Sequence, residues 1–370
     1  MPDIVVVSQD DPVPDTNACG SKVYVTNLLH YLAEEKQDPL FIGVSPRDYR
    51  AFDLPYRFMG MKLFRNTTIH FLMALLIRVK QRQITPSSLI HAQKPLELIP
   101  FLIRFPENPK ILTLHGQELG RIRFKKSRLA VYIYEKLETW ILKNIDAVIA
   151  VDEVTSSYYI KEYPFLKDRI HIIPTGVDVP KLKKVSSNNK FPTMASKKRI
   201  IFVGRLEPEK NLELLLDAFQ IARGNSDGLE LVIAGDGSRK TVLQDYVRDQ
   251  KISGVTFLGS VNNDEIPSLL NSASAFILTS HYEGSPIVVK EALAVNLPVV
   301  SVDVGDVKTL IGELPGCYIT RKDKYDISDK ILEVLQDPRE YDYSDFIMDF
   351  NYDRIGAMTL ALYRKIARAG

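Results

Sequence analysis

The segment His281-Tyr-Glu-Gly-Ser-Pro-Ile-Val-Val-Lys-Glu-Ala292 lies between two short apolar runs, at residues 273–279 and 297–301. Each run has the length and composition of a buried strand. A strand, a Gly-Ser-Pro turn, a helix and a second strand form the pattern of a parallel α/β unit. The turn would lie at the carboxyl end of a strand, which is where open α/β sheets bind ligands.

The start of the predicted helix has the features of an anion-binding site. Pro286 suits the first helical turn, where a missing N–H costs nothing, and Ser285 before it can cap the helix. The backbone N–H groups of Ser285, Ile287, Val288 and Val289 would then be directed at an anion. The segment therefore predicts a phosphate-binding helix terminus.

Two carboxylates, Glu283 and Glu291, flank this helix start and are eight residues apart. Carboxylates do not bind phosphate, but they accept hydrogen bonds from sugar hydroxyls. A helix end that attracts phosphate, between two acids that attract hydroxyls, predicts a site for a nucleotide sugar. The ordinary alternative is that Glu283 is a loop acid near a helix dipole and that Glu291 lies on the surface.

The composition is that of a soluble globular protein with two domains. The chain has 370 residues, of which 45% are hydrophobic and 25% charged. Its two cysteines, Cys19 and Cys317, give neither a disulfide framework nor a metal-ligand spacing, which favours a reducing compartment. The start at 1–7 lacks a basic leader, and the longest apolar run, 71–77, is shorter than the ~20 residues of a spanning helix. We therefore expect a cytoplasmic protein.

Positive charge is concentrated in the first half of the chain. Residues 1–190 hold 27 Lys and Arg against 20 Asp and Glu, whereas residues 191–370 hold 21 against 26. Basic residues alternate with large apolar ones at 57–82 and again at 121–128, which predicts a surface that meets an anionic membrane at its inner face. The residues assigned to this membrane or acceptor face are Arg65, Arg78, Arg121, Arg123, Lys125 and Lys126. A solvated face over an ordinary core helix is the alternative, and no recognition motif indicates nucleic acid.

Two positions in the first half follow the end of a predicted structural element. Gly20 marks a junction between a polar loop and an amphipathic helix, where the backbone can approach a phosphate closely; a plain helix cap is the alternative. His115 follows the predicted strand at 110–114. A single histidine at such a place is more often structural than functional.

The second half opens with a predicted strand at 198–203 that leads into Gly204-Arg205-Leu206. Lys210 follows at the start of the next predicted helix, so two cations would lie beside a backbone anion site. A second strand ends in a Gly-Asp-Gly turn that begins at Gly235. The glycine spacing does not fit a dinucleotide-binding fingerprint.

The two glutamates, with Gly284 after the first and Ala292 after the second, resemble the signature of retaining glycosyltransferases of the GT-B fold, specifically the large family 4. Other motifs of that family occur in order, and these are His115-Gly116, Gly176-Val177-Asp178, Gly204-Arg205-Leu206 with Lys210, and the strand and glycine turn at 298–306. The resemblance runs from Ile4 to the last predicted helix.

The resemblance implies an α/β fold with two Rossmann-like, doubly wound domains that face each other across a cleft. The first, at 1–180, would bind the acceptor, and the second, at 199–349, would bind the nucleotide sugar. Residues 181–198 would be the linker, and the helix within 350–370 would cross back to pack on the first domain.

The resemblance also implies roles for individual residues. Arg205 and Lys210 would bind the nucleotide diphosphate, Glu283 the hydroxyls of the donor sugar, Glu291 the ribose, and His115 the sugar. The remaining residues assigned to the donor site are Gly20, Gly204, Gly235, Gly284, Ser285, Pro286, Ile287 and Val288. The family usually has paired glycines where this chain has only Gly20. No cofactor or metal is expected, because two cations and a helix dipole suffice for a diphosphate.

We therefore predict a retaining glycosyltransferase that moves a hexosyl-type sugar from a nucleotide-diphosphate sugar to a hydroxyl acceptor, such as a lipid-linked or surface-polysaccharide precursor. A nucleotide-sugar epimerase of the same fold is an alternative, although it needs additional acid–base carboxylates at the sugar. A non-catalytic nucleotide-sugar-binding or scaffold protein is another, although a scaffold has no need for both cations and both acids.

Overall fold

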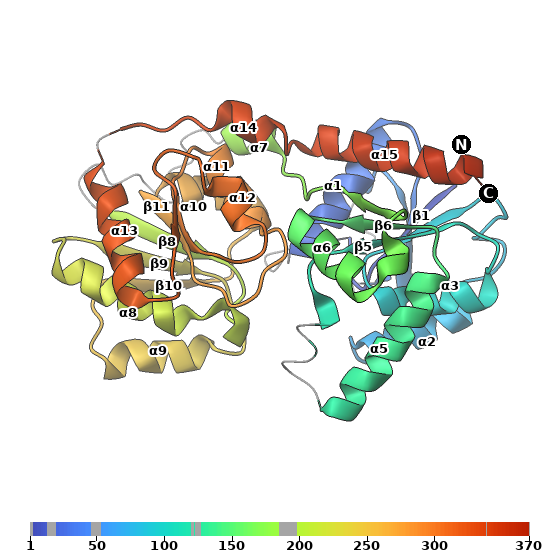
Figure 1. Ribbon diagram of the computed structural model, residues 1–370, viewed down its shortest axis with the longest axis horizontal. Coiled ribbons are helices and arrows are strands. Elements are labelled where there is room, and N and C mark those ends of the chain that lie inside the picture. The colour runs from blue at the N-terminus through green and yellow to red at the C-terminus, as the bar shows by residue number, and fades with distance from the viewer. Residues whose placement is uncertain are drawn as a thin grey trace. The chain divides into compact units, whose positions relative to one another are not determined.

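The computed structural model describes residues 3–12, 20–45, 53–119, 122, 127–184, 198–337 and 339–369. The chain forms two compact units (Figure 1). Unit 1 comprises Met1–Val13, Ser21–Gly176 and Tyr352–Gly370, and unit 2 comprises Pro14–Gly20 and Val177–Asn351.

Unit 1 is built on a seven-stranded parallel sheet with the order β3-β2-β1-β4-β5-β6-β7. Its strands are β1 (Ile4–Val7), β2 (Leu40–Val44), β3 (Arg57–Met61), β4 (Leu89–Ala92), β5 (Lys110–Leu114), β6 (Ala147–Ala150) and β7 (Ile170–Ile172). The helices between them include α1 (Gly20–Glu34), α2 (Thr68–Arg78), η2 (Pro95–Leu98), α3 (Ile99–Arg104), α5 (Arg128–Lys143), α6 (Glu153–Glu162) and η3 (Pro164–Leu166). Every position of β1, β4, β5 and β6 is buried, as expected where helices cover both faces of a parallel sheet.

The last helix, α15 (Tyr352–Ala369), belongs to unit 1 although it follows the whole of unit 2. Tyr363 on this helix is fully buried, and its hydroxyl lies 2.5 Å from Nδ1 of His91 on β4. Gly356 lets the helix approach α1, since a Cβ at this position would lie 2.3 Å from the ring of Tyr31. The prediction of a C-terminal helix that packs back on the first domain is confirmed.

Unit 2 contains a six-stranded parallel sheet with the order β10-β9-β8-β11-β12-β13. Its strands are β8 (Arg199–Val203), β9 (Glu230–Ala234), β10 (Val255–Gly259), β11 (Ala275–Leu278), β12 (Val299–Val302) and β13 (Tyr318–Thr320). Its helices include α7 (Val179–Lys183), η4 (Pro208–Lys210), α8 (Leu212–Gly224), α9 (Lys240–Asp249), η5 (Asn263–Glu265), α10 (Ile266–Asn271), α11 (Ile287–Ala294), α12 (Val307–Ile311), α13 (Lys324–Gln336) and α14 (Ser344–Met348). Two parallel sheets with surrounding helices confirm the predicted pair of Rossmann-like domains.

The unit boundaries differ by a few residues from those predicted at 180 and 350. Unit 1 ends at Gly176, and Val177 pairs with Asn351 in a parallel bridge inside unit 2. The range 181–198 predicted as a linker begins within α7, which Asp178 caps by accepting from the N–H of Lys181. The rest of that range, 185–197, lies outside the described residues.

Candidate functional site

The site in unit 2 is built on the carboxyl edge of its sheet, where two close backbone contacts require glycine. Gly235, after β9, has a φ of +139°, and a Cβ there would lie 1.9 Å from the carbonyl oxygen of Gly204, which follows β8. Gly305, after β12, has a φ of +55°, and a Cβ there would lie 1.9 Å from the carbonyl oxygen of Gly284. Positive φ and the absence of space together exclude a side chain at both positions.

Lys210 and Glu283 form an ion pair at this edge. Lys210 Nζ lies 2.6 Å from Glu283 Oε1, and the Ser280 hydroxyl donates to the same oxygen at 2.6 Å. The two charged side chains are only 17% and 12% exposed. The Thr279 hydroxyl donates to the backbone carbonyls of Lys210 and Asn211 and so fixes the backbone that carries the lysine. The structure therefore joins the two predicted site residues in one partly desolvated pair.

Arg205 lies on the same edge but has a different partner. Its Nη2 is 3.5 Å from Glu209 Oε1, and its side chain is 51% exposed. The carbonyl of Glu209 accepts from the N–H of His281, so this pair is tied to the loop that carries Glu283. The exposed guanidinium provides a second cation beside the glycine turns.

The start of α11 corrects two details of the prediction. The helix begins at Ile287 with Pro286 as its N-cap, so Ser285 does not cap it. The Ser285 hydroxyl instead donates to Asp306 Oδ2 at 2.5 Å and accepts from Lys290 Nζ at 2.7 Å. The N–H of Val289 donates to the carbonyl of Pro286 and is not directed at an anion. The first-turn N–H groups of Ile287 and Val288 remain, since the first N–H groups of a helix have no intrahelical acceptor.

The sequence interpretation missed Lys290 and Asp306. Lys290 is completely buried, and its ammonium lies 4.8 Å from the centre of the Phe350 ring. Through Ser285 it connects α11 to the loop after β12 that carries Asp306. The burial of Lys290 could have been predicted from its spacing in the helix. It is three residues after Ile287 and four before Ala294, so it lies on the same helix face as these two buried residues.

Glu291 follows on the same helix and stands in a desolvated environment. Burial raises the pKa of this carboxyl to about 7. No side chain or backbone group among the described residues forms a hydrogen bond or an ion pair with it. A carboxylate in this state is stabilised when a ligand hydroxyl donates a hydrogen bond to it.

In unit 1, His115 follows β5 and is half-buried. Its Nε2 lies 3.0 Å from the amide oxygen of Gln93, and its ring meets the Tyr24 ring edge to face at 5.1 Å between centroids. Because an amide oxygen only accepts, this bond places the proton on Nε2 and leaves Nδ1 as an acceptor. Burial and the charge of Lys94 lower the pKa of His115 to about 4, so the imidazole is neutral at pH 7.

Glu97 is a second residue that sequence reasoning missed. Its fully buried carboxylate accepts from the backbone N–H groups of Gln9, Gln93 and Lys94, at 2.9, 3.1 and 3.1 Å. It therefore joins the loops that leave β1 and β4, and it fixes the residue that binds His115. Its contact with Gln9 could not be predicted from the local sequence, because Gln9 is 88 residues away, whereas Gln93 and Lys94 precede Glu97 by only four and three residues.

The other predicted residues of the first half are only partly described. Gly20 is the first residue of α1 and is exposed. Arg65 and Arg78 are exposed, before and at the end of α2. Arg121, Arg123, Lys125 and Lys126 lie outside the described residues.

The fold and the site together define the class of GT-B glycosyltransferases. The fold has two parallel α/β domains, and the last helix packs on the first of them. The site has a paired cation and acid at the sheet edge of the second domain. Residues 18–181 match the family described as Glycosyltransferase Family 4, and residues 186–345 match Glycosyl transferases group 1. The chain belongs to glycosyltransferase family 4, as the sequence motifs predicted.

Curated relatives are 28% to 29% identical to this chain over the aligned residues. Glycogen synthase of Mycobacterium tuberculosis is 28% identical over 249 residues, which is 64% of this chain and 57% of that protein. The chain thus spans little more than half the length of that relative. The putative glycosyltransferase EpsF of Bacillus subtilis is 29% identical over 302 residues, or 78% of this chain and 77% of that protein.

Solved structures reproduce the fold over the whole chain. Sucrose-phosphate synthase from Thermosynechococcus elongatus superimposes with a TM-score of 0.86 at 20% identity and covers 100% of both chains. HepE of Anabaena, in complex with UDP and glucose, superimposes with a TM-score of 0.76 at 16% identity and covers 99% of this chain and 100% of its own. At these identities the likeness establishes the GT-B fold.

Proposed function

We propose that this glycosyltransferase moves a hexosyl-type sugar, with retention of its anomeric configuration and without a metal ion, from a nucleotide-diphosphate sugar to a hydroxyl acceptor. The observation that carries the proposal is the Lys210–Glu283 pair beside the start of α11, together with Glu291 in the same helix, which has no hydrogen-bond partner among the described residues. Lys210 and Arg205 would bind the diphosphate, Glu283 the sugar hydroxyls and Glu291 the ribose.

The chemical demand of the transfer is stabilisation of the leaving group. The bond from the anomeric carbon to the phosphate oxygen breaks, and negative charge grows on the departing diphosphate. Arg205, Lys210 and the N–H groups of Ile287 and Val288 supply fixed positive potential for that charge. This set of groups can do the work that a divalent cation does elsewhere.

Retention is proposed to follow from attack on the face that the diphosphate leaves. The acceptor oxygen bonds to the anomeric carbon, and its proton passes to the departing phosphate oxygen, so no enzyme nucleophile is needed. The neutral His115 is assigned a contact with the donor sugar, because its free Nδ1 accepts a hydroxyl.

The acceptor is proposed to be a lipid-linked or surface-polysaccharide precursor, met at the inner face of the cytoplasmic membrane. A related protein of Bacillus subtilis, the putative teichuronic acid biosynthesis glycosyltransferase TuaC, is 28% identical over 248 residues. The exposed Arg65 and Arg78 fit an anionic surface. No described helix has both the length and the apolar character needed to cross a bilayer.

A thermal-shift screen of UDP-, GDP-, ADP- and CMP-sugars identifies the donor, and turnover with and without an acceptor then tests the reaction. We expect one donor to stabilise the protein and to be consumed with acceptor in the presence of EDTA, giving a product with the anomeric configuration of the donor by NMR. Conversion of the donor to a stereoisomer without acceptor would indicate an epimerase. Donor binding without any turnover would indicate a non-catalytic binding protein.

The proposed role of Glu291 predicts a pH-dependent affinity for the donor. Only the ionised carboxylate accepts two hydroxyls, and its pKa in the free protein is raised to about 7. Affinity should therefore rise with pH and be about ten-fold weaker at pH 6 than at pH 8. The measurement is calorimetric titration with the intact nucleotide sugar, because a terminal phosphate would itself titrate near pH 6.

Glu291→Gln is the matched control for that titration. The amide has no charge to lose, so its affinity should be weaker and the same at both pH values. The folded-state pKa lies above the ordinary value of 4.5, so ionisation of Glu291 destabilises the free protein as pH rises through 7. Glu291→Gln should therefore unfold at a higher temperature than wild type at pH 8. Equal pH dependence in both proteins would rule out the ribose assignment.

A further inference from the structure

Helix α5 exposes an apolar face to solvent and buries an acidic residue. Its inward side holds Glu138, whose carboxylate accepts from the hydroxyls of Tyr159 at 3.1 Å and Tyr163 at 2.8 Å. Its outward residues recur at the three- and four-residue spacing of a single helix face, and these are Leu129, Tyr132, Ile133, Leu137 and Trp140. Leu129 is 70% exposed. Because Tyr134, Ile141 and Leu142 are buried on its inward side, α5 is apolar on both sides, whereas an ordinary surface helix is polar on its outer face.

Helix α2 shows the same feature. Phe71 and Leu75 are fully buried in the core of unit 1, yet the opposite side of the helix is also apolar, with Ile69, Met73 and Ile77 exposed. Both α2 and α5 pack against η2, and α2 also packs against α3. Figure 1 shows α2, α3 and α5 grouped at one end of unit 1. We call the exposed residues of α2 and α5 the apolar end face.

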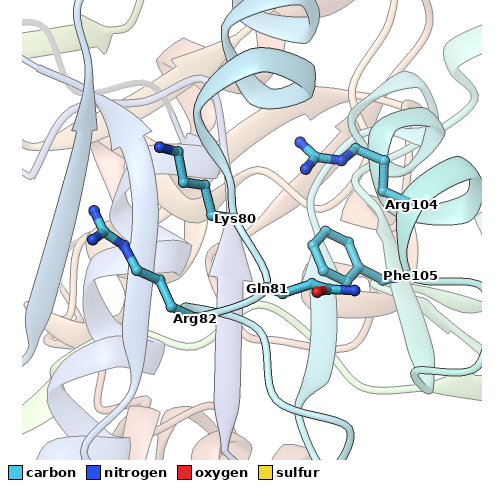
Figure 2. Close-up of a pocket in the computed structure, with 5 residues that line it drawn as sticks. All are labelled: Lys80, Gln81, Arg82, Arg104 and Phe105. Carbon is cyan, nitrogen blue, oxygen red and sulfur yellow. The ribbon is translucent and has the colours of Figure 1, made fainter.

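A basic pocket lies where α2 and α3 end. It has a volume of about 470 Å³ and is lined by Lys80, Gln81 and Arg82, which follow α2, and by Arg104 and Phe105 at the end of α3 (Figure 2). The guanidinium of Arg104 is held in place, because its Nη1 donates to the carbonyls of Leu76 and Val79.

The three cations of this pocket have no acidic partner in the part of the chain that the structure describes. Among the described residues no carboxylate forms an ion pair with Lys80, Arg82 or Arg104. The charge of the nearby Glu107 acts on Lys110, on the first residue of β5. The pocket therefore offers three positive groups and part of a buried aromatic side chain, Phe105, to an anionic ligand.

We propose that the apolar end face docks on an anionic lipid bilayer and that the Lys80–Arg82–Arg104 pocket binds the phosphate of a lipid headgroup. Apolar side chains beside cations are the pattern of a surface that enters the boundary between headgroups and acyl chains. Tyr132 and Trp140 are residue types that favour that boundary. Membrane docking itself does not depend on the proposed function. Only its biological purpose rests on that function, because docking would bring the enzyme to a membrane-borne acceptor.

A second copy of this chain fits the surface less well than a bilayer does. A two-fold dimer would place the same patch on both partners, so the pocket cations of one copy would approach those of the other. Like charges brought together in this way oppose association. Negative lipid headgroups neutralise the same cations.

Trp140 makes the proposal directly measurable, because it is the only tryptophan of the chain and lies on the apolar end face. We expect its fluorescence emission to shift to shorter wavelength when vesicles of phosphatidylcholine with 30% phosphatidylglycerol are added at low salt. Pure phosphatidylcholine vesicles should give little or no shift, and added salt should weaken binding to the anionic ones. Unchanged emission with the anionic vesicles would overturn the proposal.

Three double variants separate the contribution of the pocket cations to vesicle binding from that of the apolar end face. Lys80→Ala/Arg82→Ala should weaken vesicle binding about thirty-fold, since each cation near an anionic surface contributes roughly five-fold. Leu129→Gln/Ile133→Gln should abolish the emission shift. Lys161→Ala/Lys167→Ala, which removes two exposed lysines elsewhere in unit 1, is the matched charge control and should bind like wild type. Equal loss in the pocket variant and this control would contradict a phosphate-binding pocket.

Two further measurements assign the source of the phosphate and separate this inference from the enzymatic one. Inorganic phosphate and glycerol phosphate at equal concentration should not compete with the vesicles; full competition would indicate a free phosphate ligand in place of a lipid. Concentration-dependent dimerisation that Leu129→Gln/Ile133→Gln removes, without vesicle binding, would show a protein interface instead. Donor turnover with a soluble acceptor should be the same in all three variants, so loss of membrane binding and loss of enzymatic function are distinguishable.

Discussion

Replacement of Lys210 by methionine is expected to lower kcat for sugar transfer about 10²- to 10³-fold, the usual cost of losing one preorganised group that stabilises developing charge. Methionine keeps most of the volume of the lysine stem and removes its charge. Lys210 is only 17% exposed and is fixed by Glu283, so its charge needs little reorganisation when the diphosphate leaves. Steady-state kinetics with the donor identified by thermal shift is the measurement.

A control for Lys210→Met is Lys240→Met, which removes another ion-paired lysine of unit 2, bound to Asp236 after β9. This variant should keep kcat within about two-fold of wild type, because the surface pair contributes little. The KM for the donor should rise less than kcat falls, since the interaction strengthens as the bond breaks. A kcat for Lys210→Met within ten-fold of wild type would remove Lys210 from the catalytic assignment.

Replacement of Lys290 by methionine is expected to have the largest effect on stability, a loss of about 3 kcal/mol in the free energy of unfolding. The ammonium is completely buried and bonds to Ser285, which in turn donates to Asp306. Its removal takes a buried positive charge away from the Ser285 hydroxyl that bonds to the buried Asp306 carboxylate. Urea denaturation monitored by circular dichroism measures the change.

The double variant Lys290→Met/Asp306→Asn tests the cause. Neutralising the acid removes the second buried charge of this network, so the double variant should be more stable than Lys290→Met alone, and the coupling energy should exceed about 0.5 kcal/mol. Donor affinity should fall in both variants, because Ser285 loses the bond that fixes the turn before α11. Additive losses would show that Lys290 and Asp306 act independently of each other.

Much of the site could be predicted because its residues adjoin recognisable local elements. Lys210 and Glu283 follow glycine or serine turns after apolar runs, and parallel strands bring their carboxyl ends to one sheet edge. Glu97 could not be found in this way, since the N–H group that ties it to the loop after β1 belongs to Gln9, 88 residues away in the chain. The capping role predicted for Ser285 was wrong, because Lys290 and Asp306 compete for its hydroxyl more effectively than a helix N–H does.

The sequence by itself determined the two parallel α/β domains and the order of their motifs, because apolar runs, turn glycines and helix starts are local properties of a chain. Only the tertiary structure decided which side of a helix meets solvent. In α5 both sides are rich in apolar residues, and the side that contains Glu138 is the buried one. Tyr159 and Tyr163 on and after α6 satisfy that carboxylate inside the protein and leave the face of Leu129 and Trp140 outside. Burial depends on which partners an element packs against, and those partners come from distant parts of the chain.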